Sequence, residues 1–152
     1  MERIEPFARV GLFELYCDIK YAKEILEKES INYTEETWEN DECTVPVPWE
    51  IIHASNGMDL YFAKNKLFKI RMDESFEGTL PNGIRIGMDM SAARQIDKSL
   101  VFDEWEEDWQ SDLGYWIEDD IEGGTVSSIT IFVKEAMNAD EFELYEWCQV
   151  PK

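Results

Sequence analysis

Two neighbouring segments of the chain concentrate carboxylates and aromatic rings, which are side chains that can hold a cationic partner. The first segment is Val101–Trp109 and the second is Tyr115–Asp120, and neither contains Lys or Arg. Carboxylates steer and select cationic groups, while buried aromatic side chains supply much of the affinity of an interface. The pattern therefore predicts a surface that binds a basic partner. Ordinary strands with acidic solvent-facing sides are the alternative.

Residue types that serve catalysis do not form a recognisable catalytic set. His53 is the only histidine, and a lone histidine is more often structural than catalytic. Acidic pairs such as Glu106-Glu107 and Asp119-Asp120 could serve glycoside hydrolysis or bind a divalent cation, but a chain with 34 acidic residues contains such pairs by chance. The sequence has neither the EF-hand spacing nor a Gly-rich phosphate loop. We therefore expect no catalytic residues, no metal and no cofactor, and thus a protein that is not an enzyme.

The charge balance is the strongest global signal, because 34 Asp and Glu oppose 14 Lys and Arg for a formal net charge of −20. Such a field repels nucleic acid and anionic membranes, so we expect direct binding to neither. The N-terminal residues show no signal-peptide pattern, and no apolar run is long enough to span a membrane. Cys17, Cys43 and Cys148 fit no zinc or redox spacing, which indicates reduced thiols. These features predict a cytoplasmic location.

The elements that would position the acidic and aromatic residues occur as two similar units. Val10–Leu12 and Ile86–Met88 begin the units. A helical pattern follows each, with Tyr16, Ile19, Ala22, Ile25 and Leu26 in the first and Ala92, Ala93 and Ile96 in the second, and alternating strands come after it. The expected fold class is α+β: two tandem helix-plus-antiparallel-meander units, about residues 7–73 and 83–134, form one continuous curved antiparallel sheet with helices on one face. Residues 1–152 then make a single domain, in which 135–152 is a C-terminal segment.

Two connecting segments are predicted to lie outside the regular meanders. Residues 39–55 form an insertion in the first unit, and Pro46 and Pro48 predict a loop or edge segment because proline cannot donate to a central ladder. Residues 74–83 are rich in turn-forming residues and are predicted to link the units.

Strand alternation assigns each side chain to one face of the predicted sheet. The row Ile129, Ile131 and Val133 should face the helices, as should its counterpart Phe68, Ile70 and Met72. Helices that cover one side leave the other side open. The residues that we expect to contact a partner from this open face are Trp38, Tyr61, Asp103, Trp105, Glu107, Trp109, Trp116, Glu118, Asp120 and Phe132. As alternatives, the insertion or the C-terminal segment covers this face, or the face is a homodimer contact.

The order of an apolar residue, Gly-Met or Gly-Leu, a helix and a meander resembles the unit of β-lactamase inhibitor proteins and of the small lipoproteins of outer-membrane assembly. The tandem arrangement is similar to the inhibitor proteins in particular. The residues that carry this resemblance are Ile86-Gly87-Met88 with Ala92 and Ala93, and Val10-Gly11-Leu12 with Ala22. It implies a curved sheet whose open face clamps another protein. Because the chain lacks the secretion signal and paired cysteines of those inhibitors, we expect a target other than β-lactamase.

In size, acidity and lack of a signal the chain is also similar to bacterial immunity proteins, which neutralise a toxin, often a basic nuclease, inside the producing cell. The favoured hypothesis is therefore an immunity or antitoxin protein that occludes the active site of a basic toxin. Carboxylates would pair with Lys or Arg of the toxin, and tryptophans would be the buried anchors. The alternatives are an acidic mimic of nucleic acid that blocks a non-toxin DNA- or RNA-binding protein, and a small enzyme or a domain that binds a small ligand or sugar.

Overall fold

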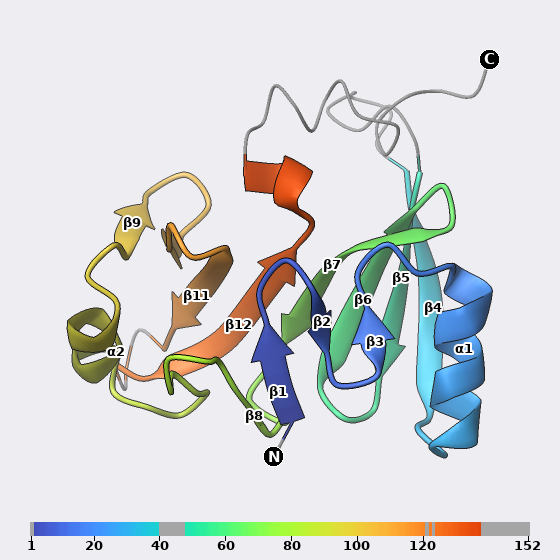
Figure 1. Cartoon of the computed structure of the whole chain (residues 1–152), viewed down its shortest axis with the longest axis horizontal. Helices are drawn as coiled ribbons and strands as arrows, with labels where there is room; N and C mark the ends of the chain where they lie inside the picture. Colours follow the sequence, from blue (N-terminus) through green and yellow to red (C-terminus); the bar gives the residue numbers. More distant parts are fainter. Residues whose placement is uncertain (1, 40–47, 121, 123, 138–152) are drawn as a thin grey trace.

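The computed structural model describes residues 2–39, 48–120, 122 and 124–137. This part of the chain is α+β, as the sequence predicts, with two α-helices and two β-sheets (Figure 1). A short 3₁₀ helix, η1 (Lys134–Met137), follows the last strand. None of these helices is long and apolar enough to cross a membrane.

The larger sheet contains eight strands and is antiparallel throughout. Across the sheet their order is β4 (Tyr33–Trp38), β5 (Trp49–Ala54), β6 (Met58–Ala63), β7 (Lys66–Met72), β12 (Val126–Phe132), β11 (Tyr115–Asp119), β10 (Asp108–Gln110) and β9 (Val101–Asp103). β7 and β12 meet at the centre, where Ile70 lies opposite Ile131. Helix α1 (Ile19–Lys28) precedes the four strands on one side of this central pair, and helix α2 (Met90–Ile96) precedes the four strands on the other.

Helix α1 is stabilised by an N-terminal capping residue and by apolar residues at helical spacing. The side chain of Asp18 accepts a hydrogen bond from the backbone nitrogen of Lys20 at 2.9 Å, which caps the first turn. Ile19, Ala22 and Leu26 recur at helical spacing and are buried against the sheet. The helices at 19–28 and 90–96 confirm the two helical patterns of the sequence.

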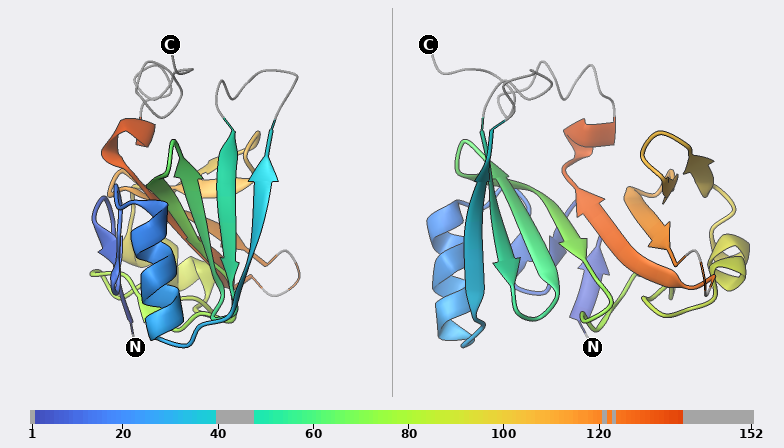
Figure 2. Two further views of the ribbon diagram at one scale, coloured as in Figure 1. Left: turned by 90° about the vertical axis from the view of Figure 1, so that its right-hand side faces the viewer. Right: turned by 180° about the vertical axis from the view of Figure 1, so that it is seen from behind.

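A smaller sheet covers the same face of the large sheet as α1, which the sequence did not predict (Figures 1 and 2). It contains β3 (Phe13–Glu14), β2 (Arg9–Val10), β1 (Glu2–Glu5) and β8 (Gly78–Thr79) in that order. Ile4, Val10 and Phe13 from these strands belong to the main core. The segment predicted as a link between units thus contributes β8, which pairs with β1 in parallel.

The core lies between the large sheet and the layer formed by α1, α2 and the small sheet. Leu60, Ile70, Ile117 and Ile131 are fully buried on the covered face of the large sheet. They come from four different strands, and burial of such a continuous aliphatic row is a main driving force for folding. The predicted core row Ile129, Ile131 and Val133 is confirmed, since all three residues are fully buried.

One prediction about the first four strands is wrong. Residues 49–54 were assigned to the insertion at 39–55, but they form β5 and pair with β4 on one side and β6 on the other. The prolines that suggested a loop precede this strand, so they remove no hydrogen bond from it. Most of the predicted insertion, residues 40–47, lies outside the described residues, as does the C-terminal segment from residue 138 onward.

Candidate protein-binding surface

The face of the large sheet that points away from the helices and the small sheet is here called the outer face (Figure 2). A row of polar residues crosses its centre from β5 to β11. His53 Nδ1 lies 2.7 Å from Asp59 Oδ1, and Arg71 Nη1 lies 3.7 Å from Asp59 Oδ2. Arg71 Nε then contacts Glu118 Oε1 at 2.9 Å, and the Ser128 hydroxyl donates to the same carboxylate at 2.9 Å. The carboxylates of Asp59 and Glu118 therefore already have partners in the same chain, namely Arg71 for both and His53 for Asp59.

The pKa values along this row agree with internal pairing. Burial alone raises the pKa of Glu118, but the hydrogen bonds from Arg71 and Ser128 and the charge of Arg71 outweigh burial and hold the pKa below its ordinary value. The hydrogen bond to Asp59, aided by Glu36, raises the pKa of His53 above its ordinary value despite partial burial. Glu118 was predicted to pair with a cationic group of a partner, and Arg71 instead provides that cation from within the chain.

Beside this polar row, an aromatic cluster surrounds Lys69. The Lys69 ammonium lies 4.2 Å from the ring centroid of Tyr61 and 5.1 Å from that of Trp49, which is cation–π geometry. The Trp49 ring is 5.0 Å from that of Phe68 and 5.0 Å from that of Trp38. Phe68 was predicted to be a core residue, and it is buried in the main core. The register shifts next to it, and its ring also lies against Trp49 and Tyr61.

We predict that the Lys69 amine titrates near neutral pH. Burial lowers the pKa of Lys69 to about 8, although the carboxylates of Glu106, Asp108 and Glu118 oppose the shift. Carbon-13 NMR of the lysine ε-carbons as a function of pH measures this value, and a Lys69→Met variant identifies the resonance. A midpoint close to that of a free lysine amine, about 10.4, would show that water reaches this ammonium and that the aromatic cluster does not enclose it.

The hairpin formed by β9 and β10, residues 101–110, is here called the acidic hairpin, and it carries the most exposed large hydrophobic side chain among the described residues. Trp105 is 95% exposed at the turn. The carboxylate of Asp103 holds the turn by accepting hydrogen bonds from the backbone nitrogens of Trp105 at 2.9 Å and Glu106 at 3.0 Å. Glu107 takes a φ of 57°, so the chain reverses here and returns as β10.

Glutamates surround Trp105 in this turn. The salt bridges in the described part of the chain include none to Glu104, Glu106 or Glu107. The acidic hairpin therefore differs from the centre of the outer face, where the carboxylates pair with Arg71 and His53. It combines an exposed tryptophan with carboxylates that form no salt bridge in the described part of the chain.

The structure divides the predicted contact residues into three groups. Trp38, Tyr61, Trp116 and Glu118 lie on the outer face, as predicted. Asp103, Trp105 and Glu107 belong to the acidic hairpin, while Asp120 follows β11 and is exposed. Trp109 and Phe132 do not fit their predicted roles.

Trp109 lies on the covered face, so its assignment to the open face is wrong. It pairs across the strands with Phe102 and with the fully buried Ile117, and the guanidinium of Arg94 from α2 lies 4.7 Å from its ring centroid. The prediction continued the alternation of side chains from residue 101 to residue 109 as if this were one strand. The chain instead turns after Asp103, which pairs with Asp108, so the alternation does not continue through the turn.

Phe132 cannot contact a partner in this structure. Its side chain is 0% exposed, and its ring lies 4.4 Å from Trp116 and 6.1 Å from Phe7, measured between centroids. Phe7 belongs to the connection between β1 and β2, and no pattern in the sequence predicted that this connection reaches Phe132. Phe132 thus acts as a packing residue beneath Trp116.

Sequence reasoning also missed a buried polar cluster around Asp97. The Asp97 carboxylate is 5% exposed and accepts hydrogen bonds from the hydroxyls of Ser99, Ser111 and Tyr115. Asn82 donates in turn to the Tyr115 hydroxyl at 3.1 Å. These residues have no common sequence spacing, and only the fold brings them together behind β9, β10 and β11.

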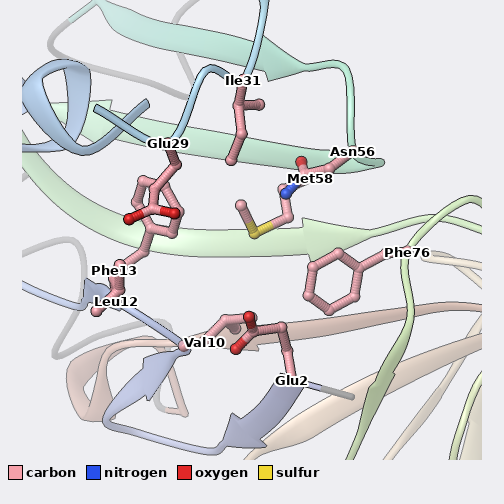
Figure 3. Close-up of a pocket in the computed structure, with 10 residues that line it drawn as sticks. Glu2, Val10, Leu12, Phe13, Glu29, Ile31, Asn56, Met58 and Phe76 are labelled. Atoms are coloured by element: carbon pink, nitrogen blue, oxygen red, sulfur yellow. The ribbon is translucent and has the colours of Figure 1, made fainter. Parts of the chain in front are cut away.

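A hollow lies between the small sheet and the end of α1 (Figure 3). Its volume is about 140 Å³, and Glu2, Glu29, Met58 and Phe76 are among its lining residues. Pockets for drug-sized ligands usually measure about 300–1,000 Å³. The hollow therefore suits a few water molecules better than a sugar or nucleotide. The buried Asn56 Oδ1, which lacks a partner within the described part, borders this space.

Groups suited to covalent or metal chemistry are sparse in the described residues. No cluster of three His, Cys, Asp or Glu side chains there has metal-binding geometry. Cys17 is a free thiol, and burial together with nearby Glu14 and Asp18 raises its pKa to about 11, which makes it a weak nucleophile at neutral pH. Cys43 and Cys148 lie outside the described residues.

Comparisons of the chain with protein-family models, with curated proteins and with solved structures gave no match. A functional proposal for this chain therefore rests on its fold and its residues.

Proposed function

We propose that this chain is a protein-binding inhibitor, and specifically an immunity or antitoxin protein that acts in the cytoplasm by occluding the active site of a basic toxin, such as a nuclease. The observation that carries the proposal is the acidic hairpin, where Trp105 is 95% exposed among unpaired glutamates. A fully exposed tryptophan contributes little to the stability of its own chain but is a strong anchor when an interface buries it.

The distribution of charge indicates which class of partner the surface fits. The chain carries a formal charge of −20, which accelerates encounter with a basic protein and repels nucleic acid. The carboxylates of Glu104, Glu106 and Glu107 have no cation of this chain within salt-bridge distance in the described part. Lys or Arg side chains that normally bind a phosphate backbone would satisfy them, and this pairing would close the active site of a nuclease.

We also infer that the two halves of the large sheet are copies of one helix-plus-meander unit and that they form a single curved sheet. Each half consists of a helix and four antiparallel strands, and the last strands of the halves, β7 and β12, pair at the centre. Ile70 and Ile131, which occupy equivalent positions in the two predicted units, lie directly opposite each other in this pair. This arrangement supports the resemblance to inhibitors that clamp a target with a sheet.

Affinity capture from the source cell, followed by reconstitution with purified proteins, tests the proposal. We expect a basic partner that forms a stoichiometric complex and loses its enzymatic activity as the complex forms. Complex formation should weaken as the salt concentration rises, because exposed charge pairs are screened. Failure to recover any basic protein whose activity the chain inhibits would reject the proposed function, and a captured partner that stays fully active would do the same.

A further inference from the structure

We propose that β9 is a docking edge, to which a basic extended segment of the partner adds as a ninth strand of the large sheet. This inference rests on the proposed function, because it states how the basic partner is held. In the part of the chain that the structure describes, β10 is the only strand that pairs with β9. Figure 1 and the right-hand view of Figure 2 both place β9 at the end of the molecule farthest from α1.

The two edges of the large sheet differ in how they are protected. At the β4 edge the exposed side chains include Thr34, Glu35, Glu36 and Thr37, and Lys23 Nζ contacts Glu35 Oε1 at 2.6 Å. Charged side chains and short ion pairs on an edge strand disfavour the addition of another strand. The β4 edge is therefore protected by its own side chains.

The β9 edge is apolar. Val101 is 67% exposed and Phe102 is 42% exposed, and they point to opposite faces of the sheet. Asp103 is the one charged residue of this strand, and its carboxylate is held by backbone nitrogens in the turn rather than projecting along the edge. An added strand would bury Val101 on one face and Phe102 on the other while it pairs with free backbone groups of β9.

The charge around this edge favours a basic segment of a partner over a second copy of the chain. β9 continues directly into the acidic turn of the hairpin. A shallow pocket beside Phe102 is lined by Glu104, Glu106, Glu107, Glu118 and Asp119. A second copy of the chain would bring an identical set of carboxylates, and a further charge of −20, against this region. Like charges in register disfavour strand pairing. An extended segment with alternating Lys or Arg and apolar residues complements both the apolar edge and the acidic surroundings.

A terminally blocked peptide of alternating Lys and Val residues is the probe for this edge, and its counterpart of alternating Glu and Val controls for charge. Added to the full chain, the Lys-Val peptide should slow amide hydrogen exchange at residues 101–103. It should also give backbone nuclear Overhauser contacts between peptide and β9. The Glu-Val peptide should do neither. Unchanged exchange at β9 at millimolar Lys-Val peptide, or pairing of the peptide with β4, would overturn the inference.

Two variants with the same change in net charge locate the contact. Val101→Lys places a cation on the β9 edge and should weaken peptide binding at least about tenfold, or about 1.4 kcal/mol. Thr34→Lys makes the same charge change on the β4 edge and should leave affinity within a factor of about two. Equal effects of both variants would mean that general attraction, not strand addition at β9, holds the peptide.

The outcomes separate this inference from the proposed function. If the captured partner is inhibited in a stoichiometric complex while β9 exchanges at its free rate, strand addition is wrong and the inhibitor proposal stands. If the Lys-Val peptide pairs with β9 but no basic protein is captured and inhibited, the edge inference stands and the proposed function fails.

Discussion

Replacing Asp97 by alanine should lower the free energy of unfolding by about 3 kcal/mol, because buried hydroxyls lose a charged acceptor. The carboxylate is 5% exposed and binds the hydroxyls of Ser111 at 2.5 Å and Ser99 at 2.7 Å, together with that of Tyr115. Through these contacts it joins the end of α2 to β10 and β11. Urea unfolding followed by tryptophan fluorescence measures the change. Asp112→Ala is the matched control, since Asp112 is exposed, and it should change stability by less than about 0.5 kcal/mol.

The effect of Asp97 should depend on pH in a defined direction. Burial by itself raises the pKa of Asp97, but the hydrogen bonds from Ser111, Tyr115 and Ser99 outweigh it and hold the pKa below its ordinary value. The folded state therefore favours the ionised form, and this contribution is fully present above the pKa of the unfolded chain, about 4. The stability difference between wild type and Asp97→Ala should shrink as the pH falls below that value. A difference that grows in acid would contradict this assignment.

Gly114→Ala should destabilise the protein by about 3 to 4 kcal/mol, from a positive φ and from overpacking together. Gly114 has a φ of 96°, and an added Cβ would overlap the ring of Phe7. Gly83 offers a close control, because its φ is 94° and an added Cβ there would meet nothing within 4 Å. Gly83→Ala should therefore cost only the backbone part, about 1 to 2 kcal/mol.

A double variant separates the two causes at Gly114. In a Phe7→Ala background the ring is gone, so Gly114→Ala should cost about as much as Gly83→Ala does in the wild type. Thermal or urea unfolding of the wild type, the three single variants and the double variant gives the comparison. Equal losses of unfolding free energy for Gly114→Ala and Gly83→Ala in the wild-type background would mean that Phe7 does not pack against the turn at Gly114. The contact between Phe7 and Phe132 could then not explain why Phe132 is buried.

Periodic features were predicted well from the sequence, because burial imposes them directly. The apolar spacing of Ile19, Ala22 and Leu26 predicted α1, and the alternation of Ile129, Ile131 and Val133 predicted the covered face of β12. Both patterns continue without interruption over several residues. The predicted class, α+β, follows from such elements and agrees with the structure.

Local interruptions account for the errors at the candidate surface. The turn after Asp103 interrupts the alternation of side chains, so that Trp109 lies on the covered face. The small sheet was not predicted because its strands are very short. β2, β3 and β8 contain two residues each, which is too few to show an alternating pattern. The pairing of Glu118 with Arg71 depends on contacts between distant strands, which spacing along the chain does not reveal.

These corrections move the candidate contact region from the centre of the outer face to one end of the sheet. The central carboxylates pair with Arg71 and His53, and Phe132 is buried. Trp105 and the glutamates around it keep the properties that the sequence suggested, namely an exposed aromatic ring and unpaired negative charge. The acidic hairpin is thus the part of the predicted surface on which binding should depend most.

The affinity of the Trp105→Ala variant for the captured basic partner tests this account most directly. Isothermal titration calorimetry should show at least about 30-fold weaker binding, equivalent to about 2 kcal/mol, because the anchor of the interface is removed. Tyr21→Ala, which truncates a 53% exposed aromatic residue on α1, should bind like the wild type, and both variants should keep the wild-type unfolding midpoint. A folded Trp105→Ala protein that binds and inhibits the partner as well as the wild type would contradict the account.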